Sequence, residues 1–129
     1  MKTVLVADDN ASSRELLREI LNGDFVLLEA GDGPEALVQA AAGNPDLLLL
    51  DIQMPGLDGF AVLRRLRAQP RFAALPVVAL TAFAMEGDEE KARAAGFDAY
   101  ITKPINAAAL RRELAQVLAA SREKRHAGA

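Results

Sequence analysis

Four consecutive leucines at residues 47–50 constrain the fold of this chain more than any other feature. A strand that is buried on both faces carries an uninterrupted apolar run, so the leucines predict a central strand of a parallel sheet. The run ends on Asp51, and Met54-Pro55-Gly56 then turns the chain. Open α/β sheets place their ligand crevices at the carboxyl ends of such strands, and a carboxylate is a poor packing group there. We therefore expect Asp51 to have a chemical function.

The rest of the chain alternates between apolar strands and amphipathic helices. Besides the leucine strand, we expect strands at residues 2–7, 25–30, 76–81 and 99–101. Helices are expected at about residues 11–22, 34–43, 58–68, 86–95 and 106–121, with a loop at residues 70–76. This alternation predicts an α/β fold with a doubly wound, five-stranded parallel sheet in the flavodoxin-like order 2-1-3-4-5. Residues 1–121 then form a single domain, and residues 122–129 form a polar tail that we expect to be frayed.

Composition excludes several classes of protein. A chain of 129 residues is long enough for one domain with a real core. The net charge of -3 predicts no nucleic-acid partner, and the lack of cysteine excludes disulfides, thiolate nucleophiles and cysteine metal sites. No signal-peptide pattern and no apolar run of about 20 residues is present, so we predict a cytoplasmic protein that does not enter a membrane.

Chemically useful side chains follow four of the five expected strands. The carboxyl ends of parallel strands share one edge of the sheet, so these groups should converge: Asp8 and Asp9, Asp51, Thr81, and Lys103. Three carboxylates in one place repel each other unless a cation intervenes, and an all-oxygen ligand set suits Mg²⁺. A lysine and a hydroxyl beside them suit an anionic ligand such as a phosphoryl group, and aspartate is a known covalent acceptor of that group.

Each of these residues also has an ordinary structural interpretation. Asp9 or Asn10 can simply cap the first helix, and Thr81 alone is more often a turn or cap hydroxyl. Lys103 alone is usually a solvated lysine, and Asp58 is assigned to capping the third helix rather than to chemistry. Because the groups occur together at four strand ends, the functional interpretation is favoured.

Taken together, the motifs resemble the receiver domain of two-component response regulators: Asp8-Asp9, Asp51-x-x-Met54-Pro55-x-x-Asp58-Gly59, Thr81-Ala82 and Lys103-Pro104. The resemblance covers essentially the whole chain, in order and at the spacing of the family. Residues 81–89 are similar to single-domain receivers of the DivK type.

The resemblance implies a phosphorylation-dependent signalling switch. Asp51 would accept a phosphoryl group from a phosphohistidine on a histidine kinase or a histidine phosphotransfer protein. Mg²⁺ would be bound by Asp9, by Asp51 and by the backbone carbonyl of Gln53, with Asp8 acting mainly through a metal-bound water. The protein would catalyse only its own phosphorylation and dephosphorylation, and would not be an enzyme in the usual sense.

The same resemblance implies how the signal leaves the site. Lys103 would pair with Asp51 and then with a phosphoryl oxygen, through a cis peptide bond to Pro104. Thr81 would bind another phosphoryl oxygen, and Tyr100 would change rotamer with it. A downstream protein target would then bind the face formed by the fourth helix, the fifth strand and the fifth helix. Gln53 and Phe83 would flank the water that attacks the phosphoryl group.

Two other classes are less consistent with the sequence. A Mg²⁺-dependent phosphohydrolase with an aspartyl nucleophile usually has Asp-x-Asp after its first strand, whereas here Asp8 and Asp9 are adjacent. Such an enzyme also carries a substrate-capping insertion, which is missing here. A flavodoxin needs a hydroxyl- and glycine-rich phosphate loop at that position, and Asp8-Asp9-Asn10 would repel a phosphate.

Overall fold

The computed structural model of the chain describes residues 1–82 and 84–127, with side-chain positions as far as Ser121. Five strands alternate with helices, as the sequence predicts. The strands are β1 (Thr3–Ala7), β2 (Val26–Ala30), β3 (Leu47–Asp51), β4 (Val77–Thr81) and β5 (Ala99–Thr102). The helices are α1 (Ala11–Leu21), α2 (Gly33–Gly43), α3 (Gly59–Arg67), the 3₁₀ turn η1 (Pro70–Phe72), α4 (Asp88–Ala95) and α5 (Ala107–Ala127).

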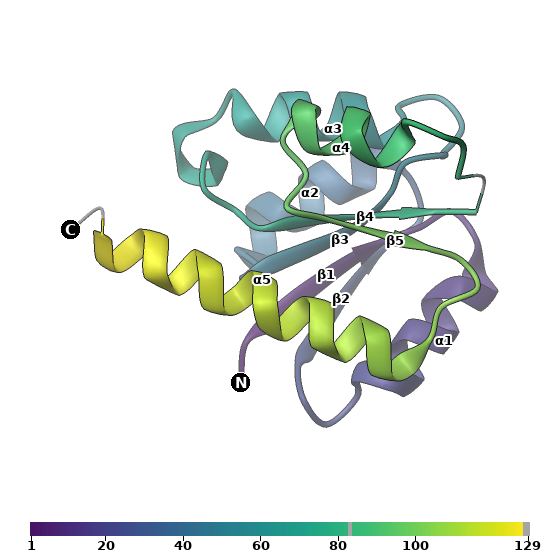
Figure 1. Ribbon diagram of the computed structural model, residues 1–129, viewed down its shortest axis with the longest axis horizontal. Coiled ribbons are helices and arrows are strands. Elements are labelled where there is room, and N and C mark those ends of the chain that lie inside the picture. The colour runs from purple at the N-terminus through teal and green to yellow at the C-terminus, as the bar shows by residue number, and fades with distance from the viewer. Residues whose placement is uncertain (83, 128–129) are drawn as a thin grey trace.

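All strand pairs are parallel, and the sheet order is β2-β1-β3-β4-β5, which confirms the predicted topology. Helices α2, α3 and α4 cover one face of the sheet, and α1 and α5 cover the other (Figure 1). This arrangement buries β3 on both faces and between two neighbouring strands. The central leucine strand of the sequence is therefore the centre of the structure.

The leucine run divides its side chains between the two layers of the core. Leu48 and Leu50 pack under α2, α3 and α4, whereas Leu47 and Leu49 pack under α1 and α5. All four are fully buried, since successive side chains of a strand point to opposite faces. Burial of a leucine side chain contributes about 1.5–3 kcal/mol, so this strand anchors both layers.

Side-chain caps start four of the helices, including α5, where Asn106 accepts the backbone N–H of Ala109 at 2.9 Å. Asn10, Asp32 and Asp58 each accept a hydrogen bond from the backbone N–H three residues ahead, at the first turns of α1, α2 and α3. The capping assigned to Asp58 is thus confirmed, and the cap of α1 is Asn10. Helix α4 instead follows Gly87, which provides no side-chain cap, and it begins two residues later than residue 86.

Two other segments differ from the sequence prediction. The expected loop at residues 70–76 contains η1. The tail that we expected to be frayed continues α5 as far as Ala127, and its arginine, glutamate and lysine residues favour helix. The division into a domain of residues 1–121 and a tail of residues 122–129 remains a prediction.

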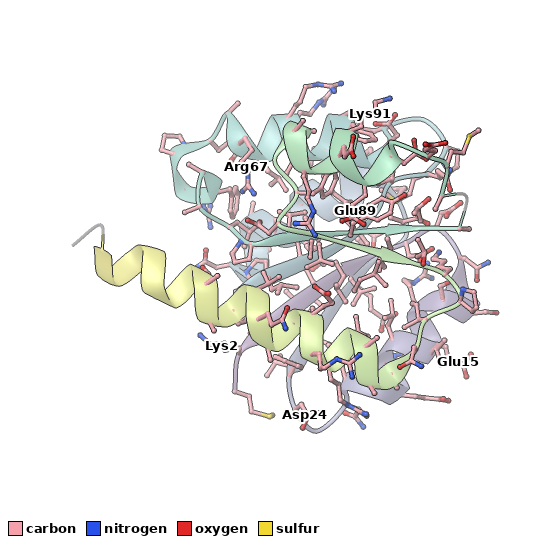
Figure 2. All side chains as sticks on the ribbon, in the orientation of Figure 1. Lys2, Glu15, Asp24, Arg67, Glu89 and Lys91 are labelled. Carbon is pink, nitrogen blue, oxygen red and sulfur yellow. The ribbon has the colours of Figure 1, made fainter. Side chains whose placement is uncertain are left out.

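Helix α4 is the least anchored helix of its layer. Ala92 is its only buried residue, and most of its surface is charged, including Glu89 and Lys91 (Figure 2). An alanine offers little apolar area to bury, so few contacts hold this helix against the sheet. Within the described residues, none of the helices combines the length and apolar character that a membrane span requires.

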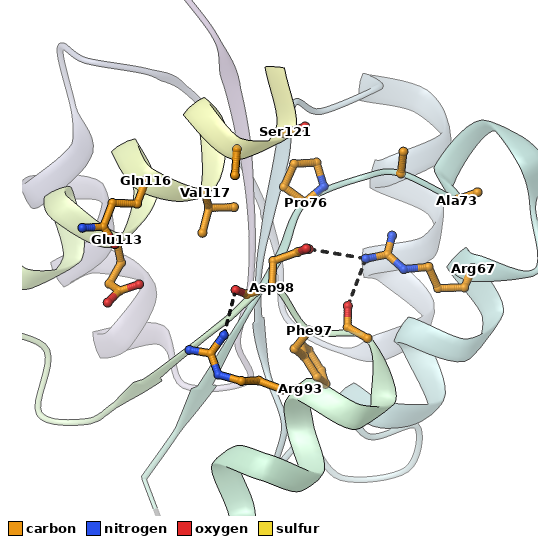
Figure 3. Close-up of a pocket in the computed structure, with 13 residues that line it drawn as sticks. Arg67, Ala73, Pro76, Arg93, Phe97, Asp98, Glu113, Gln116, Val117 and Ser121 are labelled. Carbon is orange, nitrogen blue, oxygen red and sulfur yellow. Dashed lines mark hydrogen bonds and ion pairs between the residues drawn. The ribbon is translucent and has the colours of Figure 1, made fainter. Parts of the chain in front are cut away.

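At the amino ends of the strands, Arg67 links the loops that precede β4 and β5. Its guanidinium donates to the backbone carbonyls of Phe72 (2.8 Å), Leu75 (2.7 Å) and Gly96 (3.2 Å), and lies 3.5 Å from the carboxylate of Asp98. These contacts line a cavity of about 810 Å³ between the loops that precede β4 and β5 and the helix α5 (Figure 3). Because they gather at the amino ends of the strands, they lie at the edge of the sheet away from Asp51.

Candidate functional site

The acidic residues predicted from separate strands meet at the carboxyl edge of the sheet. Carboxylate oxygens of Asp8, Asp9 and Asp51 all lie within 4.8 Å of one another. Asp8 and Asp51 are buried, whereas Asp9 is exposed to solvent. The cluster is therefore open on one side and enclosed on the other.

Asp51 is held at the end of β3 by its own turn. One carboxylate oxygen accepts the backbone N–H of Gln53 at 2.9 Å, and the N–H of Ile52 donates to the carbonyl of Leu80 at 2.9 Å. Gly59 allows α3 to start directly against this turn, since a Cβ there would lie 2.7 Å from the carbonyl oxygen of Asp51. The motif glycine is thus explained by close backbone approach.

Lys103 joins the carboxylates from the other side. Its ammonium lies 2.8 Å from Asp8 and 3.3 Å from Asp51, with 16% of its side chain exposed. The backbone N–H of Lys103 donates to the carbonyl of Thr81 at 2.8 Å, which links the ends of β4 and β5. The peptide bond between Lys103 and Pro104 is cis, as the resemblance implied.

The site retains an excess of negative charge. Burial raises the pKa of Asp51 to about 6, and the charge of Asp8 adds to the effect, against the opposing N–H of Gln53 and the ammonium of Lys103. Burial alone would lower the pKa of Lys103, but hydrogen bonding and attraction to Asp8 and Asp51 raise it overall. One ammonium therefore faces three carboxylates, and a second cation would relieve their repulsion.

This donor set fits Mg²⁺. Hard divalent cations take oxygen ligands and retain several waters, and the three carboxylates supply oxygens with one side open to solvent. Asp8, Asp9 and Asp51 are therefore the candidate residues for holding the cation.

Thr81 and Tyr100 lie next to this cluster, around a second cavity. The Thr81 hydroxyl is buried and donates to the side-chain oxygen of Gln53 at 3.4 Å. A cavity of about 180 Å³ separates it from α4 and β5, and its lining includes Ile52, Gln53, Phe60, Thr81, Asp88, Lys91 and Tyr100. Thr81 and Tyr100 therefore line the same cavity, and the coupling between them remains a prediction.

The Tyr100 hydroxyl is buried in this region. This hydroxyl has no well-formed hydrogen bond to the described residues, although the nearby Thr81 side chain lowers its pKa slightly. Burial raises the pKa of this phenol, and the charges of Asp88 and Glu89 raise it further. A buried hydroxyl without a partner is costly, which favours a side chain that can change position.

The structure brings together Asp8, Asp9, Asp51 and Lys103, and Thr81 lies beside Gln53 at the end of the neighbouring strand β4. Phe83 lies outside the described residues. Sequence analysis missed Arg14, whose guanidinium donates to the backbone carbonyl of Asp8 at 2.6 Å. The available signal was a cation in the first turn of α1, four residues after the cap Asn10.

Comparison with known proteins agrees with this geometry. The family model of the response regulator receiver domain matches residues 4–115. The chain belongs to this family. Receiver domains take part in two-component signalling: they accept phosphate from histidine kinases or phosphotransfer proteins, bind Mg²⁺ at an acidic pocket and act on downstream targets. Membership decides against the flavodoxin and phosphohydrolase alternatives.

Individual relatives confirm the likeness to DivK and to other receivers. The polar-differentiation response regulator DivK of Brucella ovis is 40% identical over 106 residues, which is 81% of this chain and 86% of DivK. The chemotaxis protein CheY4 of Vibrio cholerae superposes with a TM-score of 0.85 at 29% identity, covering 91% of this chain and 98% of that one. A putative response regulator from Chloroflexus aurantiacus superposes with a TM-score of 0.86 at 32% identity, covering 92% of this chain and 98% of that one.

Proposed function

We propose that this receiver accepts a phosphoryl group on Asp51 from a phosphohistidine of a histidine kinase or histidine phosphotransfer protein. Asp9, Asp51 and the backbone carbonyl of Gln53 would hold Mg²⁺, and Asp8 would act through a metal-bound water. When bound, the metal ion neutralises charge on the carboxylates and on the phosphoryl oxygens. Cytoplasmic location remains a prediction from the sequence.

The residues of the chain account for the transfer. A carboxylate oxygen of Asp51 attacks phosphorus as the bond to the donor imidazole nitrogen breaks. The Lys103 ammonium lies 3.3 Å from Asp51 and would pair with a phosphoryl oxygen, and the buried Thr81 hydroxyl would donate to another. Such transfers depend on positioning and charge stabilisation more than on covalent help from the protein.

A single observation carries the proposal: Asp51 is a buried carboxylate that contacts the only ammonium of the described cluster and lies beside two further carboxylates. Intact-mass spectrometry after incubation with acetyl phosphate and Mg²⁺ tests it. Wild type should gain one phosphoryl group, Asp51→Asn should gain none, and the exposed cap variant Asp58→Asn should behave as wild type. Full labelling of Asp51→Asn would refute the assignment.

The output surface is proposed to be the face of α4, β5 and α5. Ala92 is the only buried residue of α4, and the cavity lined by Thr81 and Tyr100 would give the phenol a space to enter when Thr81 turns toward a phosphoryl oxygen. A protein target that prefers the rearranged face can shift the equilibrium only by its differential affinity for that state.

Amide NMR shifts with and without beryllofluoride test this surface. Shifts should spread from Asp51 to residues 84–100 and into α5, and should leave α2 largely unchanged. Changes confined to the neighbourhood of Asp51 would contradict the proposed output face.

A further inference from the structure

Asp8 is fully buried, and the structure gives partners to its main chain and its side chain. Its N–H donates to the carbonyl of Ala30 at 3.1 Å. One carboxylate oxygen accepts the N–H of Asn10 at 2.9 Å, and the other accepts the Lys103 ammonium at 2.8 Å. The backbone carbonyl accepts Nη1 of Arg14 at 2.6 Å. A side chain therefore provides a partner for a carbonyl that lies just past the last paired residue of β1.

The guanidinium of Arg14 is itself held in place. Its Nε lies 3.5 Å from Glu29 on β2, and a Cβ on Gly31 would lie 3.5 Å from its Nη1, so the group packs closely over that glycine. Only 23% of the Arg14 side chain is exposed. Glu29 also receives two hydrogen bonds of 2.9 Å from Arg18, which keeps its carboxylate in position.

The carbonyl that Arg14 holds belongs to the peptide group between Asp8 and Asp9. A peptide group is planar, so restraining its oxygen restrains the direction in which the chain continues to Asp9. Asp9 is the exposed member of the acidic cluster, whereas Asp8 is buried. We propose that Arg14 is a positioning residue for the Mg²⁺ site, which it preorganises by holding this peptide plane. The inference rests on the proposed Mg²⁺ binding.

Charge and positioning make opposite predictions for this residue. The positive charge of Arg14 repels a divalent cation, so its removal would tighten Mg²⁺ binding if charge were the dominant effect. Loss of positioning weakens binding instead, as outer-shell substitutions around metal sites usually do. The sign of the change therefore separates the two explanations.

The experiment is a Mg²⁺ titration followed by the amide NMR shifts of Asp9, Asn10 and Gln53. Arg14→Met keeps the aliphatic stem and helix propensity but lacks the donor, and should bind Mg²⁺ about tenfold more weakly than wild type. Arg14→Lys retains the charge and should lie between the two. Arg18→Met is the matched control, because it removes the other arginine on Glu29 without touching Asp8, and should stay within about twofold of wild type.

Each outcome decides a separate point. The inference is overturned if Arg14→Met binds Mg²⁺ as tightly as wild type or more tightly. It is also overturned if Arg18→Met loses as much Mg²⁺ affinity as Arg14→Met, because that would indicate a general effect of the ion pairs with Glu29. Wild type that does not respond to Mg²⁺ overturns the proposed metal site together with the inference. Thermal unfolding in EDTA checks the fold of each variant, and Arg14→Leu, which also lacks a donor, replaces Arg14→Met under the same criterion if that protein is unfolded.

Discussion

Asp51→Asn should stabilise the metal-free protein at neutral pH, although it should abolish the proposed phosphorylation. The pKa of Asp51 is raised from 3.8 to about 6, chiefly by burial, so the folded protein binds a proton more tightly at this site than the unfolded chain does. The stability contributed by the protonated form is present below pH 4 and is lost as the pH rises from about 4 to about 6. Above that range the folded protein carries a charge that its surroundings disfavour.

The magnitude follows from the two pKa values. A pKa difference of about two corresponds to roughly 3 kcal/mol of unfolding free energy, which is the upper limit for the stability gained by Asp51→Asn. The amide oxygen of asparagine can still accept the N–H of Gln53, but the attraction of Lys103 across 3.3 Å is lost. Lys103 keeps its shorter contact with Asp8, at 2.8 Å. We expect a net gain of about 1–2 kcal/mol, or roughly 3–8 °C in the unfolding midpoint.

The assay is thermal and urea unfolding in EDTA between pH 4.5 and pH 8. Asp58→Asn makes the same chemical change at an exposed cap and should not alter the free energy of unfolding, since asparagine caps helices as well as aspartate. The gain for Asp51→Asn should shrink toward zero as the pH approaches 4.5. A variant no more stable than wild type at pH 8, or a gain independent of pH, would refute the reasoning. Saturating Mg²⁺ should stabilise wild type by about 2.7 kcal/mol at 100 times its Kd, and should not stabilise the variant equally.

Two further substitutions test the framework around the site. Arg67→Ala removes the guanidinium donor from the carbonyls of Phe72, Leu75 and Gly96 and breaks the ion pair with Asp98, although Phe72 and Asp98 each keep one backbone N–H donor. It should lower the free energy of unfolding in urea by about 2–4 kcal/mol. The exposed Arg65→Ala is the control, and equal midpoints would contradict a structural role for Arg67. Gly59→Ala places a Cβ 2.7 Å from both the Asp51 carbonyl oxygen and the Ile52 Cα. It should lower the free energy of unfolding by about 1–3 kcal/mol and slow the labelling of Asp51 by acetyl phosphate. Wild-type stability together with a wild-type labelling rate would contradict this steric argument.

The sheet and the chemical groups were predictable because they follow from local patterns combined with one topological rule. Residues 47–50 identify a strand buried on both faces, and parallel strands bring their carboxyl ends to one edge. From this rule the meeting of Asp8, Asp51 and Lys103 follows without any knowledge of side-chain contacts.

Contacts that depend on the three-dimensional path of long side chains were not predictable in this way. Arg14 and Arg67 appear in the sequence as ordinary helical cations, and only the fold shows that each reaches backbone carbonyls of other elements. The length of α5 was underestimated because a polar stretch without an apolar face gives no packing signal, although its residues favour helix.

The unequal anchoring of β3 and α4 has a consequence for how proteins of this kind diverge. Substitutions in β3 remove buried leucine contacts and move Asp51, so sequence change there is expensive for the fold and for the chemistry. Seven of the eight residues of α4 are not fully buried, and they can be exchanged at little thermodynamic cost. With α4 in the proposed output face, duplicated copies of such a chain would acquire different targets while retaining the proposed reaction at Asp51. Signalling pathways would thereby become insulated from each other within the same cell.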